Sequence, residues 1–174
     1  MAKVGIILGS DSDLPKIREC FEILEQFDIP FEIIISSAHR TPEQTKEWAG
    51  TAAKRGLKVI IAAAGGAAHL PGVVAAHTML PVIGIPVETT LAGGLDSMLS
   101  IIQMPAGIPV AAMATGKAGG TNAALFAVSI LALSDSTCAE RLEKYRSELA
   151  EKVTARNEQL QKVGYKEYIK NSRG

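Results

Sequence analysis

Residues 3–13 read KVGIILGSDSD, and the order of residue types in this stretch decides the fold. Val4–Leu8 is an apolar run of the length of one strand, and it ends at a glycine followed by serines and aspartates, which commonly begin helices. The next apolar residues recur at helical spacing, at Leu14, Ile17, Phe21 and Leu24. A strand followed directly by an amphipathic helix is the building unit of α/β folds.

The same alternation continues along the chain. Further apolar runs predict strands at Phe31–Ile35, Lys58–Ala62, Val82–Ile85 and Val110–Met113. They are nearly continuous, as expected for parallel strands covered on both faces. Between the second and third runs, Thr41-Pro42-Glu43-Gln44 is a capping box with proline at the first helical position. We therefore predict one domain over 1–174, built on a doubly wound parallel α/β sheet with right-handed crossovers.

The last part of the chain, 136–174, has a different pattern. Thr137-Cys138-Ala139-Glu140 is a second capping box, and it opens a long, highly charged helix. One stripe of this helix is apolar, at Leu142, Tyr145, Leu149, Val153, Leu160 and Val163. Such a stripe either covers the sheet of its own chain or packs on a neighbouring subunit.

Composition excludes several classes of protein. The 174 residues carry 18 basic and 18 acidic side chains, so the zero net charge disfavours a broad grip on nucleic acid or on an anionic membrane. Cys20 and Cys138 have no metal-ligand spacing and indicate two buried thiols in a reducing compartment. Ala123–Leu133 is too short to span a bilayer and predicts a buried helix. Without a leader-like start, the expected location is the cytoplasm.

Ligands of open α/β sheets bind at the carboxyl ends of the strands, where this chain has polar loops. Gly9–Asp13 offers hydroxyls, carboxylates and helix-start amides, which suit a phosphate or a ribose, or which simply cap a helix. Ser36–Pro42 places His39 and Arg40 just before a positive helix end, where a basic pair gains nothing from the helix dipole. Arg40 could bind phosphate and His39 could move a proton, or both could be a solvated loop pair.

Two glycine-rich segments follow later strands. Ala64–Gly72 matches neither the dinucleotide fingerprint nor a P-loop, but its small residues would let a flat ligand approach the backbone. His69 in this loop and His77 in the next helical pattern also suit purely structural roles, and no carboxylate lies at metal-ligand spacing from them. Gly116–Asn122 is either a loop that leads into a buried helix or part of a lid.

At these loops the chain resembles the class I 5-(carboxyamino)imidazole ribonucleotide mutases. The matching segments, in order from about Val4 to about Leu133, are Gly9–Asp13, Ser37–Pro42, Gly65–Gly72, Leu80–Val87, Ile102–Pro105 and Gly116–Gly119. The related class II carboxylases have lysine at the position of Arg40 and Gly-Arg-Ser-Asn at Gly65–Ala68, so the chain sides with class I. It departs from the family's usual residues at Ala63 and at Ala92-Gly93-Gly94.

The resemblance implies a three-layer α/β/α sandwich with a flavodoxin-like sheet, assembled as a homo-octamer with active sites at subunit junctions. It implies an isomerase of purine biosynthesis that moves a carboxylate within a ribonucleotide substrate, in a closed site and with no cofactor or metal. His39 would be catalytic and perform both proton transfers. The expected substrate-binding residues are Ser10, Asp13 and Arg40, with Ser12, Ser37, Gly65 and His69.

Two other functions remain open from the sequence. A class II carboxylase would use carbon dioxide directly, and it would be recognised by which of the two substrates it consumes. A non-catalytic, flavodoxin-like nucleotide-binding module would share the fold, and the pair His39-Arg40 together with the matching loop at Gly65–Gly72 argues against it.

Overall fold

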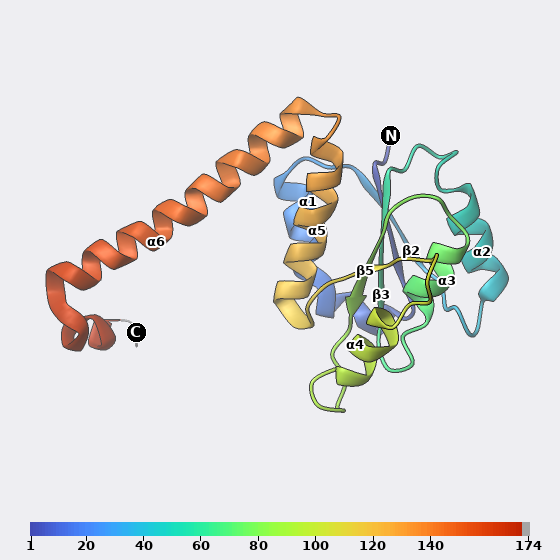
Figure 1. The fold of residues 1–174 in the computed structure, drawn as a ribbon, viewed down its shortest axis with the longest axis horizontal. Helices are drawn as coiled ribbons and strands as arrows, with labels where there is room; N and C mark the ends of the chain where they lie inside the picture. The colour runs from blue at the N-terminus through green and yellow to red at the C-terminus, as the bar shows by residue number, and fades with distance from the viewer. Residues whose placement is uncertain (172–174) are drawn as a thin grey trace.

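The computed structural model describes residues 1–171, and its centre is a five-stranded parallel sheet in the order β2-β1-β3-β4-β5 (Figure 1). The strands are β1 Val4–Leu8, β2 Phe31–Ile35, β3 Val59–Ala64, β4 Val82–Pro86 and β5 Ala111–Ala112. Ile6 of β1 lies opposite Ile33 of β2 and Ile61 of β3. This strand order is the flavodoxin-like one, and it confirms the predicted fold.

Helices cover both faces of the sheet (Figure 1). They are α1 Arg18–Gln26, α2 Pro42–Thr51, α3 Leu70–Ala76, α4 Leu95–Ile102, α5 Gly116–Ala132 and α6 Ser136–Asn171, with two short 3-10 turns, η1 Asp11–Asp13 and η2 Pro15–Ile17, before α1. The first core cluster joins one face of the sheet to α1 and α5, and the second joins the other face to α2 and α3. Both cysteines are buried, as predicted, and burial raises the pKa of the Cys20 thiol to about 12.

The outer strands differ from their predictions. β5 has two residues instead of four, because it pairs only with Ile83 and Gly84 of β4 and follows Pro109, which has no amide hydrogen for the ladder. β2 has its predicted ends but not its predicted cover, since Ile33 and Ile35 are each 46% exposed. The reason is that β2 forms the other edge of the sheet.

Helix α2 begins at Pro42, as the capping box predicts, but the Thr41 side chain does not cap it. Its hydroxyl instead accepts from the Ser37 amide at 2.9 Å and bonds the Ser36 hydroxyl at 3.0 Å. The local rule is therefore right about the position of the helix and wrong about the contact. The Thr41 hydroxyl is engaged by the loop before the helix, and it fixes the backbone that carries His39.

The long last helix starts at the predicted residue but with a different cap. α6 begins at Ser136, and the carboxylate of Asp135, not the side chain of Thr137, accepts from the Cys138 amide at 3.3 Å. Asp135 is the stronger acceptor, and an ion pair with Lys3 at 2.7 Å holds it in place. The preceding helix α5 includes Gly116–Asn122 as its first turns, so that segment is helical and not a loop.

Helix α6 leaves the body of the molecule after its first turns (Figure 1). Leu142 and Tyr145 pack on the core, where the Tyr145 ring lies 5.6 Å from the Phe27 ring. Farther along, Val153 is 66% exposed, and Gly164 interrupts the helical backbone with φ of +76°. The distal part of α6 therefore does not cover its own sheet. None of the helices within 1–171 is long and apolar enough to cross a membrane.

Candidate functional site

A hollow of about 440 Å³ lies at the carboxyl ends of the parallel strands. The loops after β1, β2, β3 and β4 all contribute to it, and its size is within the usual range for small-molecule sites. The lining residues are Gly9, Ser10, Asp13, Lys16, Ser37, Ala38, His39, Arg40, Ala64, Gly65, Ala67, Leu70, Glu88 and Thr89. The chain order reverses between β1 and β3, so the hollow occupies the switch point where open α/β sheets bind ligands.

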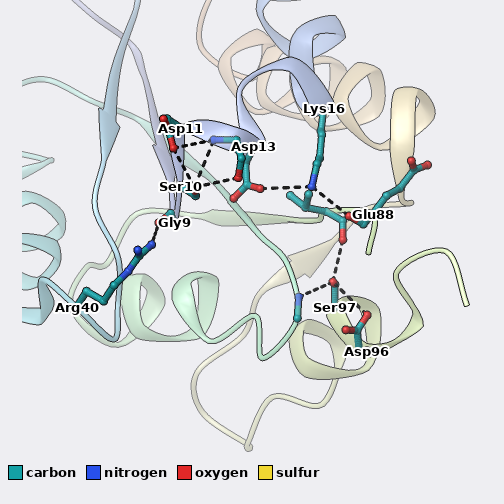
Figure 2. Close-up of polar contacts among 12 residues, drawn as sticks. Gly9, Ser10, Asp11, Asp13, Lys16, Arg40, Glu88, Asp96 and Ser97 are labelled. Atoms are coloured by element: carbon teal, nitrogen blue, oxygen red, sulfur yellow. Dashed lines mark hydrogen bonds and ion pairs between the residues drawn. The ribbon is translucent and has the colours of Figure 1, made fainter. Parts of the chain in front are cut away.

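The loop after β1 acts both as a helix cap and as one wall of the hollow. The Ser10 hydroxyl accepts from the Ser12 amide at 3.3 Å and bonds the Ser12 hydroxyl at 2.9 Å (Figure 2). Asp13 is 7% exposed, and burial raises the pKa of its carboxyl above the ordinary value. The nearby ammonium of Lys16 opposes that shift, while the carboxylate of Asp11 adds to it. Asp13 is therefore a buried acid at a ligand-sized opening.

The loop after β2 brings a guanidinium to the same opening. Arg40 donates from Nη2 to the Gly9 carbonyl at 3.2 Å, which ties the second loop to the first (Figure 2). Its backbone amide donates to the Ser37 hydroxyl at 3.3 Å. A guanidinium has five N–H donors, so Arg40 can keep this contact and still bind an anion.

The two histidines of the second and third loops are in direct contact. His39 Nε2 lies 2.7 Å from His69 Nδ1, and the rings meet edge to face with centroids 4.9 Å apart. One of these two nitrogens must carry the shared hydrogen, because a ring nitrogen without hydrogen can only accept. His69 is thus a partner of His39 rather than an isolated structural histidine. His77 lies at the far end of α3 and does not line the hollow.

The floor of the hollow is held by α4. The Gly66 amide donates to the Ser97 hydroxyl at 2.9 Å, and that hydroxyl donates to the Val87 carbonyl at 2.8 Å (Figure 2). The Ser100 hydroxyl donates to the Gly66 carbonyl at 3.3 Å. Ser97 is fully buried, and Gly66 has φ of +69°, which favours glycine. The backbone beside Gly65 is therefore fixed from below.

All predicted site residues lie in or next to the hollow. Some line it directly, and two contact a lining residue. Ser10, Asp13, Ser37, His39, Arg40 and Gly65 line the hollow. Ser12 reaches it through Ser10, and His69 reaches it through His39. Residues 1–171 contain no cluster of three or more histidines, cysteines and acids suited to a metal ion.

Sequence reasoning missed Lys16, Glu88 and Thr89 in the lining. Lys16 follows Asp13 by three residues, and Glu88 follows β4 by two, so the rule about carboxyl ends of strands would have found both. Ser97 carried no comparable signal, since nothing local to its helix indicates a contact with Gly66.

A family model described as AIR carboxylase matches residues 3–152. The chain belongs to the AIR carboxylase family. The matched range includes every loop of the hollow and ends within α6, so the family relationship covers the whole site.

Individual family members extend this match. A Thermotoga maritima protein named N5-carboxyaminoimidazole ribonucleotide mutase is 51% identical over 97% of this chain and 98% of its own length. The phosphoribosylaminoimidazole carboxylase of Saccharomyces cerevisiae is 50% identical over 97% of this chain, but over 29% of its own length. The crystal structure of Treponema denticola PurE superposes with a TM-score of 0.81 at 28% identity, covering 95% of this chain and 100% of that one.

Proposed function

We propose that the protein is a 5-(carboxyamino)imidazole ribonucleotide mutase of de novo purine biosynthesis. It converts that substrate to 4-carboxy-5-aminoimidazole ribonucleotide by moving the carboxylate from the exocyclic nitrogen to a ring carbon. The observation that carries the proposal is the convergence of His39, Arg40 and Asp13 on one hollow at the switch point of the sheet. The mutase from Thermotoga maritima supports it, because the two chains match over nearly their full lengths.

Each part of the substrate has a matching group in the hollow. Arg40 offers forked donors to the phosphate, and Asp13 offers a buried carboxylate to the ribose hydroxyls. Ser10 and Ser37 add hydroxyls on either side, with Ser12 behind Ser10. The flat imidazole rests against the small residues beginning at Gly65, whose backbone leaves room for a ring.

His39 performs both proton transfers. In the first step the bond between the exocyclic nitrogen and the carboxylate carbon breaks, carbon dioxide leaves, and His39 protonates the nitrogen that keeps the electron pair. In the second step ring carbon 4 attacks the carbon dioxide, and His39 takes back a proton from that carbon. The histidine ends as it began, so the reaction balances without a co-reactant. His69 engages Nε2 of His39 and leaves Nδ1 for the substrate.

Carbon dioxide must stay in the site between the two steps, which requires a closed cavity. The hollow of a single subunit opens to solvent, since His39 and Arg40 are exposed. We therefore propose that the protein acts as a homo-octamer in the cytoplasm, with neighbouring subunits that close the site. The exposed apolar residues of α6 support this assembly, because monomers rarely leave such residues in water.

The choice of substrate separates the mutase from the class II carboxylase. We expect purified protein to convert 5-(carboxyamino)imidazole ribonucleotide without ATP or bicarbonate, and to leave aminoimidazole ribonucleotide unchanged when carbon dioxide is supplied at low concentration. Conversion of the second substrate alone would identify a carboxylase. Binding of either ribonucleotide without conversion would identify a binding module.

A further inference from the structure

Lys16 spans the mouth of the hollow. It lies in η2, and its ammonium donates to the backbone carbonyl of Glu88 at 3.3 Å (Figure 2). The same ammonium is 3.9 Å from the Asp13 carboxylate. It therefore links the loop after β1 to the loop after β4, across the opening that a ligand must enter.

Asp13 needs such a partner in order to bind a ribose. An ionised carboxylate only accepts hydrogen bonds, which suits two adjacent hydroxyl donors, whereas a protonated carboxyl presents a donor of its own. Burial favours the protonated form, and so does the nearby carboxylate of Asp11. Lys16 is the cation that opposes both effects. The side chain of Lys16 is 44% exposed, whereas that of Asp13 is 10% exposed.

The other charges around the hollow do not replace Lys16. The ionisable residues that face Asp13 across the opening or beside it are Asp11 on η1, Lys16 on η2, His39 and Arg40 after β2, and Glu88 after β4. Arg40 contacts the Gly9 carbonyl and the Ser37 hydroxyl, and its remaining donors are those assigned to the phosphate. Without Lys16, the two carboxylates that line the hollow would outnumber the permanent cations, facing a substrate that is itself an anion.

We propose that Lys16 is a positioning residue of the substrate site, which holds the Asp13 carboxylate ionised and correctly placed to accept hydrogen bonds from the ribose. The inference rests on the proposed function for the ribose that Asp13 receives. It concerns a different residue, Lys16. Its test measures how the affinity for a sugar phosphate depends on pH, whereas the proposed function is tested by turnover.

The test measures the affinity of full-length protein for ribose 5-phosphate by calorimetry, from about pH 5.5 to about pH 8. Lys16→Met removes the charge and keeps the chain length, and Lys16→Arg keeps the charge. Lys117→Met is the matched control, because Lys117 also lies 3.9 Å from a carboxylate, that of Glu19, but does not line the hollow. The phosphate of the ligand titrates equally in every sample. The ratio of affinities between two variants therefore reports only the effect of pH on the protein.

The ratio of wild-type to variant affinity should change with pH in one direction. Loss of the cation raises the pKa of Asp13 further, so Lys16→Met should weaken binding by a factor that grows as the pH falls and is smallest near pH 8. The limit of that factor is about tenfold for each unit by which the pKa rises. Lys16→Arg should recover most of the affinity, and Lys117→Met should match the wild type. If Lys16 bound the phosphate directly, the loss would grow toward pH 8, where the phosphate carries more charge, and that result would overturn the proposal.

A double-mutant cycle isolates the pathway through Asp13. In an Asp13→Asn background, Lys16→Met should change the affinity by less than about twofold, because no carboxylate remains to be held ionised. A loss in that background as large as in the wild type would also overturn the proposal. These outcomes are separable from the proposed function. Protein that shows the expected affinity ratios but transfers no carboxylate would support the role of Lys16 and refute the mutase activity. Protein that transfers the carboxylate but lacks the expected ratios would support the mutase activity and refute the role of Lys16.

Discussion

Deletion of residues 155–174 tests whether a neighbouring subunit covers the distal part of α6. This part projects from the body of the molecule (Figure 1), and Val163, Tyr165 and Ile169 are 37%, 65% and 48% exposed. The core of the subunit should survive the deletion, because α6 packs on it through Cys138, Leu142 and Tyr145 near its start.

The expected loss follows from the area that these side chains still expose. Complete burial of a side chain of this size contributes about 1.5–3 kcal/mol, so covering the exposed half of three of them contributes about 3 kcal/mol per subunit. A loss of this size weakens association by about a hundredfold. The truncated protein should therefore dissociate at concentrations at which the full chain is assembled.

Light scattering and the transfer assay on the same dilution series measure both consequences. We expect assembly and activity to be lost together on dilution of the truncated protein, although His39 is unchanged. In the full chain, Val163→Ser should shift the same transition in a smaller degree, and Lys162→Ser should leave it in place. A truncated protein that remains assembled and active at every dilution would refute the role assigned to distal α6.

Substitutions at three further residues test the site. His39→Asn should retain substrate binding and lose turnover by about ten-thousandfold, because both proton steps are removed, and more than a tenth of wild-type activity would exclude its role. Arg40→Ala should weaken ribose 5-phosphate binding and Arg40→Lys should restore only part of it, since an ammonium lacks the planar fork; calorimetry that shows equal affinities would contradict this. Asp13→Asn should have a higher melting temperature than the wild type at pH 7 and an equal one at about pH 3. Burial raises the pKa of Asp13 in the folded state above its unfolded value. The wild type therefore loses stability as the pH rises through these two pKa values, and the asparagine variant does not. A lower melting temperature at pH 7 would show that Asp13 stabilises the fold.

Local pattern located all five strands but not all of their ends. The inner strand β3 spans Val59–Ala64, where Lys58–Ala62 was predicted. β1 and β2 have their predicted ends because each is a compact apolar run, bounded by Gly9 on one side and Pro30 on the other. β5 is shorter because the ladder with β4, which no local pattern records, decides where it ends. The exposure of Ile33 likewise depends on the position of β2 in the sheet and not on its sequence.

Part of the site can likewise be predicted from the sequence, and part depends on tertiary contacts. Topology alone predicts that residues such as Asp13, Arg40 and Gly65 meet, since the loops after parallel strands share one edge of the sheet. The contact between His39 and His69 joins loops 30 residues apart in the sequence. It depends on how far each loop extends from the sheet, which no local pattern records. The cap at Asp135 was missed for a related reason, because its ion pair with Lys3 is a tertiary contact.

Isotope retention tests the mutase proposal most directly. Substrate labelled with carbon-13 in its carboxylate is supplied to purified protein in buffer that contains unlabelled carbon dioxide, and the label in the 4-carboxy product is measured by mass spectrometry. Transfer within a closed site predicts that nearly all of the product keeps the label. Product that carries the isotope ratio of the buffer would show that carbon dioxide leaves the site, and would contradict the mutase mechanism.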